Sequence, residues 1–227
     1  MTDKKATEEI LKLLEIMATL RSSKGCPWDR EQTPETLKPY ILEEAYELIE
    51  AIDSGDTIEI RDELGDLLLQ VVFLAQIFNE RNKFGLTEIT SSINRKLIRR
   101  HPHVFADETI DGHAQRWEEI KQQERSARGK GNKLADRIPA NLPALKTATK
   151  VTKKMKGEEP DAHIHTIQQN VSTLSRLMEK PLSFQDQLSS TLGEIFFDTV
   201  KLATSLHIDA EDLVRKKTMQ VISEIDR

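Results

Sequence analysis

The sequence has few of the residues that mark secreted, membrane-spanning or β-rich proteins. Cys26 is the one cysteine among 227 residues, so the chain cannot form an internal disulfide, which fits a reducing compartment. No apolar run approaches the roughly 20 residues of a membrane span, and the N-terminus lacks the apolar core of a signal peptide. Aromatic residues make up only 5%, which favours helices over a sandwich or a barrel. These absences predict a cytoplasmic protein with no membrane partner.

The charge of the chain is close to balanced, with a formal net charge of −5. A slightly acidic chain gives no general reason to expect nucleic acid as a partner. One stretch stands apart, because residues 128–156 hold nine Lys or Arg and a single acid, Asp136. This stretch fits either a solvated basic linker and helix or a strip that attracts phosphate.

Apolar residues recur at helical spacing along the first hundred residues, which predicts an all-α fold. Glycine, proline and capping residues separate the expected helices, which cover residues 7–22, 33–54, 57–82 and 87–100. Residues 28–33 are expected to form a loop. Within the third helix, the stretch 66–78 has only Asp66, Gln70 and Gln76 as polar residues. Because a helix this apolar must be buried on all sides, we expect a homodimer or a higher homo-oligomer.

The organisation of the chain predicts two helical modules. Residues 1–110 form the first, residues 111–137 a polar and basic linker, and residues 138–227 the second. An internal repeat supports this division, because residues 63–75 align with residues 191–203 and keep a glycine and an alanine in register. A duplicated helical module is the simplest account of the repeat.

Acidic residues gather on two neighbouring helices of the first module. Glu43, Glu44 and Glu47 lie on one side of their helix, opposite its apolar stripe, and taken alone would form an ordinary solvated face. Glu63 and Asp66 share a face of the next helix and have apolar neighbours. Carboxylates that converge in such surroundings repel one another unless they bind a cation. Since Mg²⁺ prefers oxygen ligands and shares its shell with phosphates, the pattern predicts Mg²⁺-assisted phosphate chemistry.

Candidate substrate-binding residues flank these acids in the sequence. Lys96 and Arg100 lie one helical turn apart, with Arg99 beside them, and suit the charge of a polyphosphate. Basic residues at the end of a helix are equally ordinary, because they complement the helix dipole. Trp28 and Asp29 follow a Gly-Cys-Pro turn, where they either stack on and orient a base or pack the loop.

Four segments carry a resemblance to a known family: GCPWDREQT (25–33), LKPYILEEAYELIEAI (37–52), DELGDLLLQVVF (62–73) and KLIRRHPHVF (96–105). The chain resembles the MazG family of nucleoside triphosphate pyrophosphohydrolases, which belongs to the all-α NTP pyrophosphatase group. The resemblance implies two tandem MazG-like helical modules of the four-helix-bundle type, completed by dimerisation. It also implies hydrolysis of a nucleoside triphosphate between its α and β phosphates, which gives NMP and pyrophosphate.

The resemblance also assigns roles to the candidate residues. It implies Mg²⁺, with Mn²⁺ as an alternative, held by Glu44, Glu47, Glu63 and Asp66. Glu43 or Glu44 is implied as the base that takes a proton from the attacking water. Nucleoside triphosphates are the implied ligands, and Lys96 and Arg100 match the spacing of the family's polyphosphate-contacting residues. Trp28, Asp29 and Arg99 complete the predicted set of substrate-binding residues.

The second module departs from the family pattern. Thr191 stands at the position of Glu63, and only Glu194 remains as an acid. The acids of the other helix are replaced by Ser172, Thr173 and Arg176. Because one acid cannot hold Mg²⁺, the second module is expected to be inactive and to serve dimerisation, stability or regulation.

Two other interpretations remain open on the sequence. The first is a non-enzymatic helical dimer that binds nucleotides or a partner protein. The second is a nucleic-acid-binding protein that uses the basic stretch 128–156, although the net-acidic chain has no recognisable recognition helix.

Overall fold

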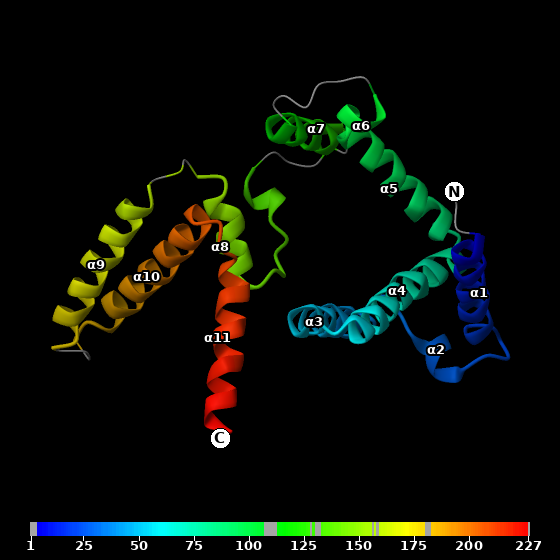
Figure 1. The fold of residues 1–227 in the computed structure, drawn as a ribbon, viewed down its shortest axis with the longest axis horizontal. Coiled ribbons are helices and arrows are strands. Elements are labelled where there is room, and N and C mark those ends of the chain that lie inside the picture. The colour runs from blue at the N-terminus through cyan, green and yellow to red at the C-terminus, as the bar shows by residue number, and fades with distance from the viewer. Residues whose placement is uncertain are drawn as a thin grey trace. The chain divides into compact units, whose positions relative to one another are not determined.

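Helices form all the regular structure in the described part of the chain (Figure 1). The structure is a computed structural model that describes residues 4–106, 113–127, 129, 133–155, 157, 159–179 and 183–226. The all-α prediction is therefore confirmed. Among the described helices, none is both long enough and apolar enough to cross a membrane.

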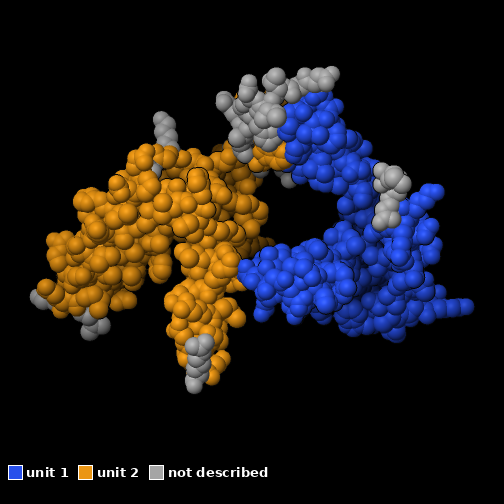
Figure 2. Space-filling view, in the orientation of Figure 1, with its two compact units in different colours: residues 1–113 blue, residues 114–227 orange. Residues whose placement is uncertain are grey.

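The chain divides into two units, residues 1–113 and residues 114–227, which Figure 2 shows in different colours. The helices of the first unit are α1 (Lys4–Leu20), α2 (Pro27–Glu31), α3 (Lys38–Ser54), α4 (Thr57–Glu80), α5 (Leu86–Arg100) and α6 (Pro102–Phe105). Those of the second are α7 (His113–Ala127, which begins at the boundary), the 3₁₀ turn η1 (Ala135–Arg137), α8 (Ala144–Thr152), α9 (Pro160–Leu177), α10 (Gln185–Ser205) and α11 (Ala210–Ile225). Helix α7 occupies part of the segment expected as a linker.

The core of the first unit lies where α4 packs against α1 and α3. These helices present apolar side chains at helical spacing, and their burial removes apolar surface from water. Partly buried leucines and an isoleucine surround the fully buried residues, which are Met17, Leu37, Val72, Phe73 and Ile77. This core fixes α3 and α4 side by side, and the candidate acids lie on those two helices.

Two neighbouring segments differ from the expected structure. The helix expected over residues 33–54 begins only at Lys38, after a turn. Residues 28–33 were expected to be a loop, whereas Pro27–Glu31 forms the short helix α2. Proline suits the first turn of a helix, since its φ is preset and it has no N–H to lose there. The turn ends at Gln32, whose N–H bonds back to the carbonyl of Asp29 at 3.3 Å.

The second unit repeats the arrangement of the first. Helix α10 packs against α8 and α9, as α4 packs against α1 and α3. Buried positions of α4 and α10 coincide in the register of the repeat, in the pairs Gln70 with Asp198, Val72 with Val200, and Ala75 with Ala203. Matched burial means that the two helices present the same face to their own cores.

Helix α4 is not covered on every side within one chain. Leu64, Leu68 and Val71 are 52%, 37% and 40% exposed, although they lie in the most apolar helix of the unit. The single chain therefore leaves an apolar face of α4 open to solvent.

Candidate metal and nucleotide site

A tight turn places α3 and α4 beside each other. Gly55 ends α3 with φ 75°, a left-handed conformation that glycine adopts without a steric penalty. The Asp56 carboxylate then caps α4 by accepting from the backbone N–H groups of Ile58 at 2.8 Å and Glu59 at 3.4 Å. Because so few residues join the helices, the two must run antiparallel and in contact, which brings their acidic faces together.

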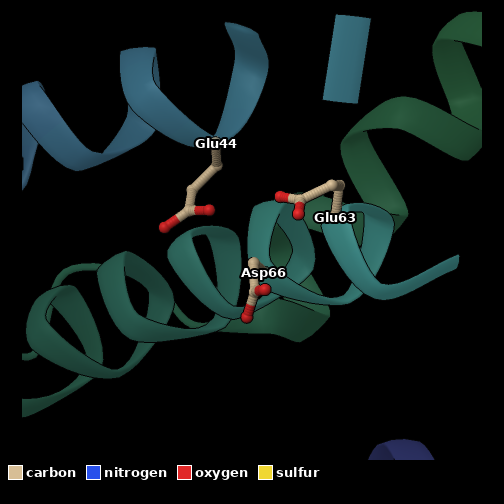
Figure 3. A group of neighbouring side chains, drawn as sticks. All are labelled: Glu44, Glu63 and Asp66. Atoms are coloured by element: carbon tan, nitrogen blue, oxygen red, sulfur yellow. The ribbon is translucent and has the colours of Figure 1, made fainter. Parts of the chain in front are cut away.

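Three carboxylates converge between α3 and α4. Glu44 extends from α3 toward α4, where Glu63 and Asp66 lie on the facing side (Figure 3). One oxygen of each side chain lies within 4.8 Å of the others. Glu63 and Asp66 meet because they are three residues apart on one helix, and Glu44 joins them only through the packing of the hairpin.

Burial and mutual repulsion make this cluster favourable for a cation. Burial raises the pKa of Glu44, and the nearby charges of Asp66 and Glu47 raise it further. Burial likewise raises the pKa of Glu63, with further contributions from Glu47 and Asp66. Glu44 and Glu63 are therefore harder to ionise, so a divalent ion or a proton stabilises the group.

Two polar atoms at the cluster lack a protein partner in the described part of the chain. Glu63 Oε2 and Gln70 Oε1 are buried and accept no hydrogen bond from any described residue. Gln70 Nε2 faces Glu44 at 3.5 Å, which is a long and weak hydrogen bond. A buried acceptor without a donor is costly, and a bound cation with its waters would satisfy these oxygens. The set of donors thus fits a hard divalent ion such as Mg²⁺.

The other predicted acids lie at the edge of the cluster. Glu47 is exposed, yet its charge is near enough to raise the pKa of both Glu44 and Glu63. Its oxygens are not among those within 4.8 Å of one another. Glu43 is exposed on α3 and also lies outside the three-residue cluster. The roles of Glu47 as a ligand and Glu43 as a base stay predictions.

The basic residues expected to bind phosphate lie on a different helix. Lys96 and Arg100 are half-buried in the last two turns of α5, and Arg99 is exposed there. The described carboxylate cluster is built from α3 and α4 alone. The assignment of these three cations to a polyphosphate also stays a prediction.

Trp28 forms an aromatic pair with Tyr40 of α3. Its ring lies edge-on to Tyr40, with centroids 6.0 Å apart and planes at 77°, and Trp28 remains 51% exposed. Tyr40 lies on α3 one turn before Glu44, on the same side of the helix. Asp29 is half-buried beside Trp28 in α2. Tyr40 was not among the predicted site residues, although its spacing from Glu44 could have indicated it.

The second unit has no acid at the repeat positions of Glu43, Glu44 and Glu47, where Ser172, Thr173 and Arg176 stand. These three residues line an open hollow along α9, together with His165, Gln168, Gln169 and Asn170. Glu194, the surviving acid, is exposed on α10. A surface with hydroxyls, amides and an arginine offers no ligand set for Mg²⁺.

Comparisons with known proteins find relatives over most of the chain. The family model of the MazG nucleotide pyrophosphohydrolase domain matches residues 32–105, which include all the carboxylates of the cluster. The nucleoside triphosphate pyrophosphohydrolase/pyrophosphatase MazG of Thermotoga maritima is 38% identical over 220 residues, 95% of this chain and 83% of that protein. The nucleoside triphosphate pyrophosphohydrolase of Escherichia coli K12 is 39% identical over 217 residues, 92% of this chain and 82% of that protein. A relative of the same name from Mycobacterium tuberculosis is 36% identical over 166 residues, 71% of this chain and 49% of that protein.

Proposed function

Because this chain belongs to the MazG family of nucleoside triphosphate pyrophosphohydrolases, we propose that it hydrolyses nucleoside triphosphates between the α and β phosphates in a Mg²⁺-dependent reaction. The products are a nucleoside monophosphate and pyrophosphate. The hydrolase activity is that of the relatives with which it shares most of its length. The Mg²⁺ requirement and the assignment of catalysis to the first unit rest on the site described above.

The convergence of Glu44, Glu63 and Asp66 is the observation that carries this proposal. Three carboxylate oxygens within 4.8 Å, two of them on groups with raised pKa values, form a strongly anionic site. Glu44, Glu63 and Asp66 would hold the ion, and Glu47 would complete the set from the edge. When bound, Mg²⁺ neutralises phosphate charge and lowers the pKa of a coordinated water, and Mn²⁺ offers the same chemistry.

The remaining residues supply a base and substrate contacts. Glu43, or a Glu44 that is not engaged with the ion, takes the proton of the attacking water. Lys96, Arg99 and Arg100 neutralise the polyphosphate. Trp28 offers its exposed ring face to the base, and Asp29 accepts hydrogen bonds from the nucleoside.

The second unit is proposed to be catalytically inactive. Ser172, Thr173 and Arg176 stand on α9 in place of the acids of α3, so this unit lacks the charge that concentrates Mg²⁺. It serves dimerisation, stability or regulation instead. All turnover is then assigned to the first unit.

The working form is proposed to be a homodimer or a higher homo-oligomer in the cytoplasm, with no membrane or nucleic-acid partner. The exposed apolar residues of α4 support this proposal, since a second copy would cover a face that water otherwise meets. A four-helix bundle made from two α3–α4 hairpins is the expected arrangement.

Product analysis tests the reaction directly. The protein is incubated with each NTP and dNTP, with Mg²⁺ and with EDTA, and the products are separated by ion exchange. Mg²⁺-dependent release of NMP and pyrophosphate is the expected result. Release of NDP and phosphate would contradict the bond assignment, and no turnover of any nucleotide would favour a non-enzymatic nucleotide- or protein-binding dimer.

A further inference from the structure

Arg21 makes a set of contacts that no assigned role explains. It follows directly after α1, and its side chain is only 7% exposed. The Nε and Nη2 atoms donate to the Glu80 carboxylate at 2.9 and 2.8 Å. This bidentate pair is supported by Phe73, whose ring centre lies 5.5 Å from the guanidinium carbon. Hydrogen bonding to Arg21 also holds the pKa of Glu80 below its ordinary value.

The other edge of the same guanidinium holds the segment that carries Trp28. Arg21 Nη1 donates to the backbone carbonyls of Asp29 and Gln32, the latter at 3.3 Å. These two carbonyls belong to the end of α2 and the residue that caps it. One side chain therefore ties α2 to the last turn of α4, which belongs to the core.

The other hydrogen bonds of the α2 segment are local, such as Gln32 Nε2 to the Trp28 carbonyl at 3.0 Å and Arg30 Nη1 to the Ser23 carbonyl at 3.3 Å. None of the residues of α2 is buried, and a helix of five residues is not stable by its own hydrogen bonds. Its preceding turn is tight, because a Cβ on Gly25 would lie 2.1 Å from the carbonyl oxygen of Leu20. Beyond that turn, Trp28 touches α3 edge-on through Tyr40, which leaves the placement of its ring dependent on the backbone beneath it.

We propose that Arg21 is a positioning residue that sets where Trp28 stands relative to the carboxylate cluster, and thereby controls binding of the nucleobase but not of the phosphates. This inference rests on the proposed function. Arg21 itself does not touch the substrate. Its guanidinium spans a carboxylate and two carbonyls at once, which the single ammonium of a lysine cannot do.

Arg21→Met tests this role, because it keeps an apolar stem over Phe73 and removes all the donors. Glu80 remains hydrated, since its side chain is 36% exposed, so the variant is expected to fold. The KM for NTPs should rise about tenfold, within the range expected when base–aromatic stacking is lost. The inhibition constant of inorganic tripolyphosphate, which has no base, should stay within about twofold of wild type, as should kcat.

The matched control is Arg215→Met in the second unit, which likewise breaks an arginine–carboxylate pair, here with Asp212 at 2.6 Å. It should change none of these constants. If Arg21→Met does not fold, Arg21→Lys serves in its place, because it keeps the charge beside Glu80 but cannot also reach the carbonyls. Arg21→Lys should show the same selective rise in KM for NTPs.

An equal loss of affinity for NTP and tripolyphosphate would overturn the inference, as would an unchanged KM in both Arg21 variants. A second measurement tests the positioning role of Arg21 independently of the proposed function. In a Trp117→Phe background, Trp28 is the only tryptophan, and its emission and acrylamide quenching report the position of α2 without any nucleotide. Failure of the wild type to hydrolyse NTPs would refute the proposed function, whereas unchanged Trp28 quenching in Arg21→Met would refute the positioning role alone.

Discussion

Removal of Asp66 should have opposite effects on activity and on the stability of the metal-free protein. Asp66→Asn keeps the shape of the side chain and removes one of the charges that repel Glu44 and Glu63. At 4.8 Å, two unit charges repel by roughly 1 kcal/mol in bulk water and by about 3 kcal/mol at the effective dielectric of a protein surface. Asp66 is exposed and salt screens the pair, so the lower figure applies. We expect the EDTA-treated variant to be about 1 kcal/mol more stable than wild type.

Urea denaturation with EDTA and with Mg²⁺ measures this effect. Mg²⁺ at a hundred times its dissociation constant should stabilise the wild type by about 2.7 kcal/mol. The variant should lose most of that gain, together with NTP hydrolysis. Asp62→Asn is the matched control, because Asp62 lies on the same helix but pairs with Arg61 at 2.7 Å and belongs to no metal-binding cluster. It should keep both activity and the response to Mg²⁺.

Either of two results would refute this reasoning. If Asp66→Asn destabilises the EDTA-treated protein, the carboxylates do not repel one another in the folded state. If Mg²⁺ stabilises the variant as strongly as the wild type, the ion binds elsewhere. A loss of hydrolysis with an unchanged Mg²⁺ response would assign Asp66 a role other than that of ligand.

Three further predictions follow from the same structure. The raised pKa values of Glu44 and Glu63 mean that these two groups bind protons more readily in the folded state than in the unfolded state. They should therefore contribute stability to the EDTA-treated protein as the pH falls from neutral toward the ordinary glutamate value of 4.5, while Mg²⁺ affinity falls. Melting of the wild type and of Glu44→Gln across this range measures the first effect and titration calorimetry the second, and identical pH profiles of the two proteins would contradict the shift of Glu44. A chain that ends at residue 125 should keep measurable pyrophosphohydrolase activity if it dimerises, and a dimeric but inactive truncation would show that the second unit contributes to the site. Leu68→Glu should dissociate the oligomer, as sedimentation velocity would detect. Phe196 occupies the equivalent position of α10 and is 67% exposed, so the sedimentation of Phe196→Glu tests whether the second unit contributes to the same contact.

The helical elements followed closely from the sequence because each depends on local chemistry. Helix boundaries depend on signals that act over a few residues, such as apolar spacing, the Ser54-Gly55 stop and the Asp56 cap. The expected third helix, residues 57–82, therefore differs from α4 by only two residues at its end. The α2 segment was missed because five residues give too little periodicity to distinguish a helix from a loop. Its position depends on Arg21, whose contacts with Asp29, Gln32 and Glu80 are tertiary and are not visible in the sequence pattern.

Some features of the candidate site were determined by the sequence, and others only by the tertiary structure. The sequence alone determined that Glu63 and Asp66 share a helical face, that Glu43, Glu44 and Glu47 belong to the preceding helix, and that the second module has lost these acids. Only the tertiary structure decided that Glu44, and not Glu43, meets Glu63 and Asp66, because the rotation of α3 against α4 is set by the core around Val72 and Phe73. It also decided that Arg21 ties α2 to Glu80, since such contacts join residues 59 positions apart. Helical periodicity fixes the neighbours within a helix, whereas packing of the whole unit fixes which faces of two helices meet.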